Sequence, residues 1–223
     1  MNNTTLNNQT TQHNQTRNNL TTACQYGQYS VFGKRGPLVE EYLATLSNVL
    51  KRALQDHPRT FAFRVDLRLP SDDLDYNEDR LIERFIASLK KKIRHNREMA
   101  KKKNGRAADT SVRYVWARET ADAGKPHFHF AFFLNQDAFH KLGVYGVGHK
   151  NMYNRVVEAW ASALELAAED ADGLVHIPKN AMYSISMNNP ASINNFFYRA
   201  SYLTKLETKN YGEGRHVFGA SRI

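Results

Sequence analysis

Two histidines, His127 and His129, are separated by one phenylalanine in a segment that alternates in polarity. Successive side chains of a β-strand point to opposite faces, so both imidazoles are expected on one face. Two imidazoles held on a rigid strand are able to share one divalent cation. The alternative is a chance match, because a His-x-His triplet alone has low specificity.

A carboxylate is available as the next ligand. Glu119 precedes the histidines by eight residues, and a hairpin between the two segments would bring it near them. Two imidazoles and a carboxylate form a hard-cation site with open positions for substrate oxygens. The alternative for Glu119 is an ordinary surface carboxylate. Asp66, on an earlier strand, is the reserve ligand.

Two tyrosines and a lysine follow in the pattern Y-x-x-x-Y-x-x-K, at Tyr198, Tyr202 and Lys205. Residues three and four apart share one face of a helix, so the pattern predicts a stripe of two phenols and an ammonium. A phenol is able to attack a phosphodiester and store it as a phosphotyrosine. The lysine would steady the phosphate or protonate the leaving oxygen. The alternative is that both rings are core aromatics.

The overall charge points to a polyanionic partner. The 223 residues carry 31 Lys and Arg against 22 Asp and Glu, a net charge of +9. Neutralised phosphates provide most non-specific affinity for nucleic acid, so DNA is the leading candidate; a basic protein without such a partner is the alternative. The single cysteine excludes an internal disulfide and a cysteine-rich zinc site. No apolar run approaches a membrane span, so we expect a cytoplasmic protein of a bacterial host that does not engage the membrane.

The elements that must position these residues follow from hydrophobic periodicity. We expect helices over 37–57, 77–103, 152–168 and 192–206, and strands over 60–69, 111–119, 126–134 and 174–178. From residue 60 the order is strand, helix, strand, strand, helix, strand, helix. This order predicts an α+β fold with a ferredoxin-like antiparallel sheet and helices packed on one face.

Six basic residues are predicted to contact DNA. Two share the strand face of Asp66, three lie in the basic half of the helix over 77–103, and one follows the first tyrosine; they are Arg64, Arg68, Lys90, Lys91, Arg94 and Arg199. Residues 1–24 are almost entirely Asn, Thr and Gln, and we expect a disordered tail there. Residues 25–58 form an N-terminal helical segment, and 59–223 the main domain.

Taken together, these motifs resemble the HUH endonucleases, and specifically their two-tyrosine rolling-circle initiators. The context that carries the likeness is Arg118-Glu119, then Gly124-Lys125-Pro126-His127-Phe128-His129-Phe130, then Tyr198 to Lys205, then Phe218-Gly219-Ala220-Ser221-Arg222. It is similar to the inovirus-type replication proteins of the YagK/YfjJ group of phages and prophages. The resemblance covers residues 40–223.

The resemblance implies a ferredoxin-like HUH palm over 59–223, with Mg²⁺ or Mn²⁺ on His127, His129 and Glu119. It implies that Tyr198 and Tyr202 nick single-stranded or supercoiled DNA at a replication origin through a 5′-phosphotyrosine, with Lys205 assisting. No G-x-x-x-x-G-K-[ST] loop is present, so a host helicase and polymerase are expected partners.

Three alternatives stay open at this point. One is another HUH activity, a relaxase or a transposase, although the third histidine of the relaxase motif is replaced by Ala123. The second is a non-catalytic DNA-binding regulatory module of a prophage. The third is a metal-dependent hydrolase whose tyrosines lie in the core.

Overall fold

A computed structural model describes residues 19–71, 76–120, 125–206 and 216–222 of the chain. Its helices are α1 (Glu40–Asp56), α2 (Glu78–Lys103), α3 (Met152–Leu164), α4 (Ala168–Ala171) and α5 (Pro190–Ala200), with short 3₁₀ helices at Gly33–Arg35, Asp172–Leu174 and Ser201–Thr204. Its strands are β1 (Leu20–Thr21), β2 (Gln25–Tyr26), β3 (Tyr29–Ser30), β4 (Leu38–Val39), β5 (Arg59–Arg68), β6 (Arg113–Glu119), β7 (His127–Asn135), β8 (Val175–His176), β9 (Met182–Ser186) and β10 (Phe218–Ala220). The predicted α+β class is confirmed.

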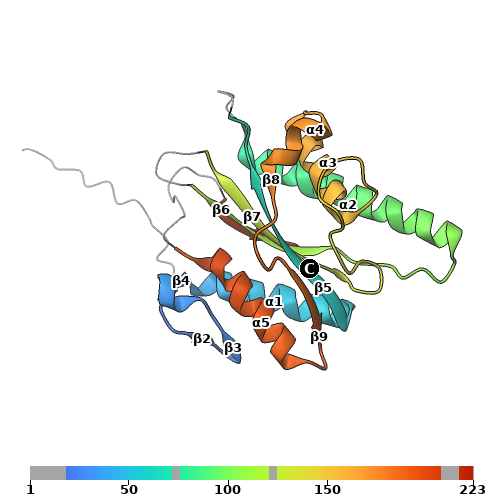
Figure 1. Cartoon of the computed structure of the whole chain (residues 1–223). Coiled ribbons are helices and arrows are strands. Elements are labelled where there is room, and N and C mark those ends of the chain that lie inside the picture. The colour runs from blue at the N-terminus through green and yellow to red at the C-terminus, as the bar shows by residue number, and fades with distance from the viewer. Residues whose placement is uncertain (1–18, 72–75, 121–124, 207–215, 223) are drawn as a thin grey trace, which may run out of the picture.

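A six-stranded sheet organises the described part of the chain (Figure 1). Its order is β10-β6-β7-β5-β8, and β9 also pairs with β5. Every printed pairing is antiparallel. The β5 strand lies centrally because β7 runs along one side of it for its whole length, and β8 and β9 divide the other side between them.

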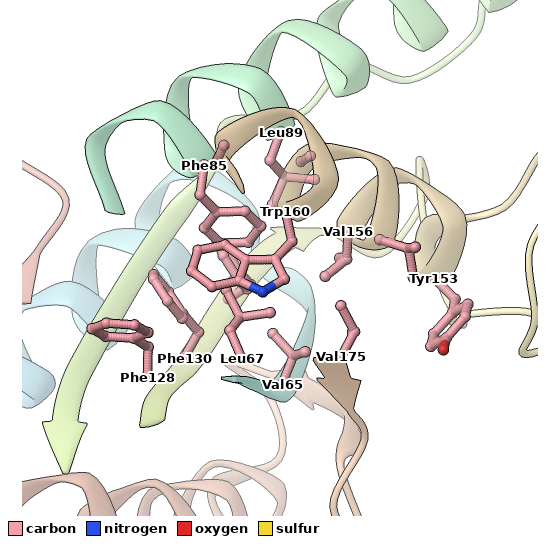
Figure 2. Close-up of a cluster of buried hydrophobic side chains, with 14 of the residues drawn as sticks. Val65, Leu67, Phe85, Leu89, Phe128, Phe130, Tyr153, Val156, Trp160 and Val175 are labelled. Atoms are coloured by element: carbon pink, nitrogen blue, oxygen red, sulfur yellow. The ribbon is translucent and has the colours of Figure 1, made fainter. Parts of the chain in front are cut away.

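One face of the sheet is covered by α2 and α3. The side chains of Phe128, Phe130 and Phe132 project to this face. Figure 2 shows Phe128 and Phe130 beside Phe85 of α2 and Trp160 of α3. The Phe85 ring meets those of Phe130 and Trp160 edge-to-face, with ring centroids 5.1 and 5.8 Å apart. Edge-to-face pairs of this kind add to the stability that burial alone provides.

The opposite face of the sheet is covered too, by α1 and α5, as Figure 1 shows. Ala62, Ala117 and Ala131 lie on this face and are fully buried, beside Phe196 of α5. The expectation of helices on a single face is therefore wrong. The strand β5 carries small and charged residues on this face, a pattern typical of solvent exposure, but the helices on either side of the sheet enclose it.

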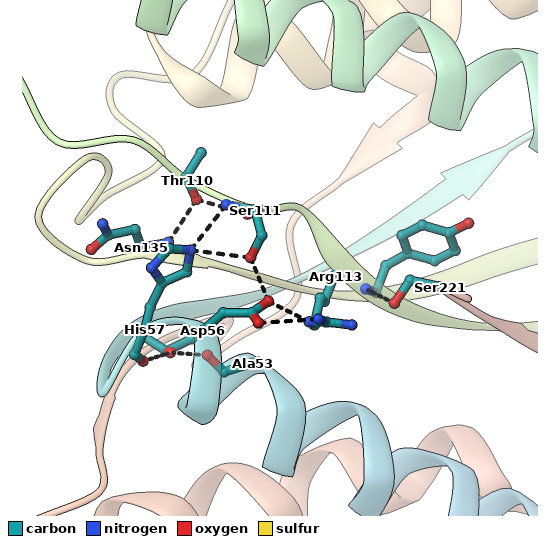
Figure 3. A network of polar contacts seen from close by, with 10 residues as sticks. Ala53, Asp56, His57, Thr110, Ser111, Arg113, Asn135 and Ser221 are labelled. Carbon is teal, nitrogen blue, oxygen red and sulfur yellow. Dashed lines mark hydrogen bonds and ion pairs between the residues drawn. The ribbon is translucent and has the colours of Figure 1, made fainter. Parts of the chain in front are cut away.

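The carboxyl end of α1 is tied to β6 by a polar network (Figure 3). Arg113 donates to both oxygens of Asp56, at 2.6 and 3.1 Å, and the Ser111 hydroxyl donates to the same carboxylate at 2.8 Å. The Ser111 amide donates to His57 Nε2 at 2.9 Å. This network connects the helix of the predicted N-terminal segment to the sheet.

Two predicted boundaries change. Most of the predicted disordered tail lies outside the described residues, but Leu20 and Thr21 form β1, which pairs with β4, so disorder does not extend to residue 24. The helix predicted over 192–206 begins earlier, where Asn189 caps it and Pro190 occupies its first turn, and it ends at Ala200. No helix in the described ranges combines the length and apolar character that crossing a bilayer requires.

Candidate active site

Three adjacent strands bring the predicted metal ligands together. Asp66 on β5 lies opposite His129 on β7. Glu119, the last residue of β6, lies opposite His127 on β7. Because side chains directly opposite each other on one face are about 5 Å apart, the register itself gathers these four groups on the face covered by α5. The predicted hairpin between β6 and β7 is confirmed, although its turn at 121–124 lies outside the described residues.

His129 occupies the centre of this cluster. Its Nδ1 donates to Asp66 Oδ1 at 2.7 Å, and its Nε2 lies 3.2 Å from Glu119 Oε2. Burial alone would lower the pKa of His129, but the hydrogen bonds with the two carboxylates outweigh it and raise the pKa to about 9. Burial would raise the pKa of Asp66, yet the bond with His129 holds it below its usual value.

The chemistry of this donor set fits a hard divalent cation. A metal-ligating histidine usually donates its second ring nitrogen to a carboxylate, as His129 Nδ1 does to Asp66. The other nitrogen then faces Glu119, with His127 beside it, and these three would hold the ion. Within the described ranges, no three His, Cys, Asp or Glu side chains already have their donor atoms arranged around one point. A cation held by these residues would take the place of the proton between His129 Nε2 and Glu119 Oε2.

Tyr202 joins the cluster directly. Its hydroxyl donates to Glu119 Oε2 at 3.3 Å, and its ring lies edge-on to that of His129 with centroids 6.0 Å apart. Burial, followed by the Glu119 charge, raises the pKa of Tyr202 to about 12. Tyr198 lies one turn earlier and is 42% exposed. The first phenol is therefore outside the cluster, while the second is inside it.

The spacing of the tyrosines predicted one continuous α-helix, but the structure has a break there. The α5 helix ends at Ala200, and the 3₁₀ turn at Ser201–Thr204 follows. Ser and Thr hydroxyls that bond to preceding carbonyls favour such tightening, and Thr204 donates to the Ser201 carbonyl at 2.7 Å. Residues three apart are eclipsed in a 3₁₀ turn, so Lys205 Nζ still lies 5.6 Å from the centroid of the Tyr202 ring.

Of the predicted DNA contacts, Arg64 lies beside Tyr202, and Arg199 precedes Tyr202 by three residues along the chain. Arg64 is buried, with its side chain only 5% exposed, and its Cζ lies 5.6 Å from the centroid of the Tyr202 ring. Arg199 donates from Nη2 to the Lys179 carbonyl at 3.3 Å. Among the described residues, neither arginine has a hydrogen-bond partner for its buried Nε atom. A phosphate oxygen is the type of acceptor that such guanidinium donors prefer.

The other four predicted DNA contacts are not gathered with these. Arg68 lies at the end of β5, opposite His127 at the edge of the cluster. Lys90, Lys91 and Arg94 are exposed on α2, which packs on the other face of the sheet. The role of all four in binding DNA stays a prediction, and the three residues of α2 lie on the opposite face of the sheet from the tyrosines.

The structure adds neighbours that the sequence did not single out. Phe32 meets the rings of Tyr198 and Tyr202 edge-on, at centroid distances of 5.5 and 6.0 Å. His176 on β8 lies opposite Asp66 in the register. Phe32 lies in a segment without periodicity, so no pattern could have connected it to the tyrosines; the short strand containing His176 was predicted, but not its pairing.

Comparison with known proteins agrees with this reading of the chain at the level of the family. Residues 21–221 match the YagK/YfjJ C-terminal domain. The chain is 33% identical over 202 residues to the uncharacterized protein YagK of Escherichia coli strain K12, covering 86% of this chain and 97% of YagK. It is 30% identical over 200 residues to the uncharacterized protein YfjJ of the same strain, covering 84% and 96%. No solved structure matches. The chain belongs to the YagK/YfjJ C-terminal domain family.

Proposed function

We propose that this protein is a divalent-metal-dependent DNA endonuclease of the HUH class, which initiates rolling-circle replication by nicking single-stranded DNA through a tyrosine. The single observation that carries the proposal is the hydrogen bond from Tyr202 to Glu119 beside His129. A nucleophile, its proton acceptor and an imidazole–carboxylate cation site meet there, as cleavage of a phosphodiester by a phenol requires.

The strand order supports the same class. Along the chain, β5, α2, β6, β7, α3 and then β8 with β9 follow the order of a ferredoxin-like palm. In space, the corresponding strands are ordered β6-β7-β5-β8, so the last strand lies beside the first. We assign this unit as the palm, with α2 and α3 behind it and the tyrosine-bearing α5 in front.

The proposed reaction is an in-line displacement at phosphorus. The Tyr202 Oη atom attacks, the P–O3′ bond breaks, and the phosphate remains joined to the tyrosine with the 5′ end of the cut strand. Glu119 Oε2 is placed to accept the phenol proton. Lys205 Nζ lies 5.6 Å from the centroid of the Tyr202 ring and would protonate the departing 3′ oxygen. A bound Mg²⁺ or Mn²⁺ would supply charge that stabilises the phosphoryl oxygens.

The two tyrosines are assigned different roles. Tyr202 is hydrogen-bonded within the cluster and makes the first cut, whereas the exposed Tyr198 is available to a second strand. Attack of Tyr198 on the regenerated junction would free a 3′ hydroxyl. Attack of that hydroxyl on the Tyr202 phosphotyrosine would rejoin the strand, release Tyr202 and end a replication cycle. Arg64 would hold a phosphate next to the one attacked, because its guanidinium lies over the Tyr202 ring. Arg199 is proposed for the same task because, like Arg64, it has a buried Nε atom without a hydrogen-bond partner among the described residues.

A gel assay tests the proposal. The protein is incubated with labelled single-stranded oligonucleotides from the origin regions of related phages, with Mn²⁺ or with EDTA. We expect a metal-dependent nick and a label that stays with the protein in SDS. The adduct should be lost in Tyr198→Phe/Tyr202→Phe, and Tyr153→Phe serves as a control in a tyrosine of the other face. Binding of DNA without any nick would instead favour a regulatory module, and cleavage without an adduct a hydrolase.

A further inference from the structure

The segment that precedes α1 is fixed against the helix that carries Tyr198. The Tyr29 ring is stacked on that of Phe197, with centroids 4.2 Å apart. The Ser30 amide donates to Asn194 Oδ1 at 2.7 Å. About two turns further along, the Phe32 amide donates to the Ser201 hydroxyl at 2.9 Å. These contacts hold residues 29–32 along α5 from its middle to the 3₁₀ turn.

The same segment is also closed on itself. The Val31 amide donates to the Cys24 carbonyl at 2.9 Å, and Gln25 pairs with Ser30 in the β2–β3 hairpin. The backbone passes so close at Gly33 that an added Cβ would lie 2.1 Å from the Ala23 carbonyl oxygen. Glycine is therefore required at this position. Residues 23–34 form a wall of fixed structure beside the tyrosines.

A pocket of about 590 Å³ lies between this wall and Tyr198. It is lined by Ala23, Cys24, Gln25, Ser30, Val31, Lys34 and Tyr198. Its size falls within the range of roughly 300–1,000 Å³ that is typical of small-molecule sites. Strand alternation places Gln25 and Ser30 on this side of the hairpin, while Tyr26 and Tyr29 line a separate hollow toward α1.

The chemistry of the lining fits one nucleobase. The exposed Tyr198 offers an aromatic face, and base–aromatic stacking tolerates any base. The Gln25 amide has both a donor and an acceptor, which a base edge requires. Lys34 is exposed at the pocket and carries the charge that a neighbouring phosphate prefers. In a DNA strand the bases project away from the sugar–phosphate backbone. A strand that places a phosphate at the tyrosines is therefore able to place a neighbouring base in the pocket beside Tyr198.

We propose that this pocket receives a single nucleobase of the DNA strand next to the phosphate that is cut, so that residues 23–34 select the sequence at one position. The inference rests on the proposed nuclease function and extends it to substrate choice. It assigns a substrate-reading role to the N-terminal hairpin, where the sequence predicted a disordered tail followed by a helical segment.

Cys24 provides a direct test, because it is the single cysteine of the chain and lines the pocket. Oligonucleotides are prepared with a disulfide-forming tether on one base at a time, and are bound to Tyr198→Phe/Tyr202→Phe so that no strand is cut. We expect the cross-link to Cys24 to concentrate at one position beside the nick, at least tenfold above the others. Equal yields along the strand, or none, would overturn the proposal.

A pair of variants on the same hairpin supplies a second readout. Gln25→Ala should reduce discrimination among bases at that position by about tenfold, the scale of one bidentate base contact. Gln28→Ala, in the turn and lining the other hollow, should leave discrimination unchanged. Nicking by the wild type is measured in parallel. If the protein nicks DNA normally but Gln25→Ala and Gln28→Ala keep the same base preferences, the base-selecting role of the pocket is refuted while the nuclease function stands. If the cross-link forms at one position but the wild type does not nick DNA, the nuclease function is refuted instead.

Discussion

The charged state of His129 makes the stability of the metal-free protein depend on pH in an unusual direction. Asp66 and Glu119 raise the pKa of this imidazole from 6.5 to about 9, against the effect of burial. At about 1.4 kcal/mol for each pH unit, the gap corresponds to roughly 3 kcal/mol of folding free energy. His129 is only 12% exposed, so solvent screening removes little of it.

The sign follows from linkage. Because the pKa of His129 is higher in the folded state, the stabilisation is complete below pH 6.5 and is lost as the pH rises through about 9. Urea unfolding in EDTA, followed by fluorescence of the buried Trp116 and Trp160, measures this loss. The free energy of unfolding should fall by about 3 kcal/mol between these pH values.

A matched pair of variants isolates the cause. His129→Gln should remove most of the fall, whereas His95→Gln, at an exposed position of α2, should retain it. A wild-type free energy of unfolding that stays constant, or increases, from pH 6.5 to 9 would show that the two carboxylates do not hold a proton on His129. The geometry assigned to the cation site would then be wrong.

Three further outcomes test the fold that supports the site. Glu78→Gln breaks the buried ion pair with Arg118, in which the atoms are 2.6 Å apart, and should cost about 3–5 kcal/mol in urea unfolding, against less than about 1 kcal/mol for Asp79→Asn. Phe85→Ala should cost about 3–5 kcal/mol, because it opens a cavity among fully buried rings. Arg113 and Ser111 hold the pKa of Asp56 below its usual value, so the resulting stability is present at neutral pH and lost as the pH falls below about 4. Asp56→Asn should therefore flatten the acid side of the stability curve, and an unchanged acid side would argue against the bidentate bond.

The strongly patterned elements could be predicted from the sequence. The alternation of Phe128, Phe130 and Phe132 placed both histidines on one face, and the register confirms this arrangement. The strand β9 was missed because it is short and lies at an edge, and its side chains are mostly not buried. The sequence named Asp66 as a reserve ligand, but its contact with His129 could be established only once the strand pairing was known, since the two residues are 63 positions apart.

The surroundings of the tyrosines were harder to predict for a physical reason. The Y-x-x-x-Y-x-x-K spacing is typical of an α-helix, and a local competition between backbone and Ser or Thr hydroxyls decided where that helix ends. The polar N-terminal segment carries few apolar residues, so its anchoring depends on Tyr29 and on two amide–side-chain bonds to α5. Such non-local contacts leave no periodic signal.

The central claim is that a phenol of this cluster becomes covalently bonded to DNA, and mapping the bonded residue tests it most directly. The wild-type protein is reacted once with a nickable oligonucleotide and Mn²⁺, digested with a protease and a nuclease, and analysed by mass spectrometry. We expect a 5′-phosphate on Tyr202, and on Tyr198 only when Tyr202 is replaced by Phe or when a second strand is supplied. Nicked DNA with no phosphotyrosyl peptide, or a phosphate on a tyrosine of the other face such as Tyr153, would contradict the account.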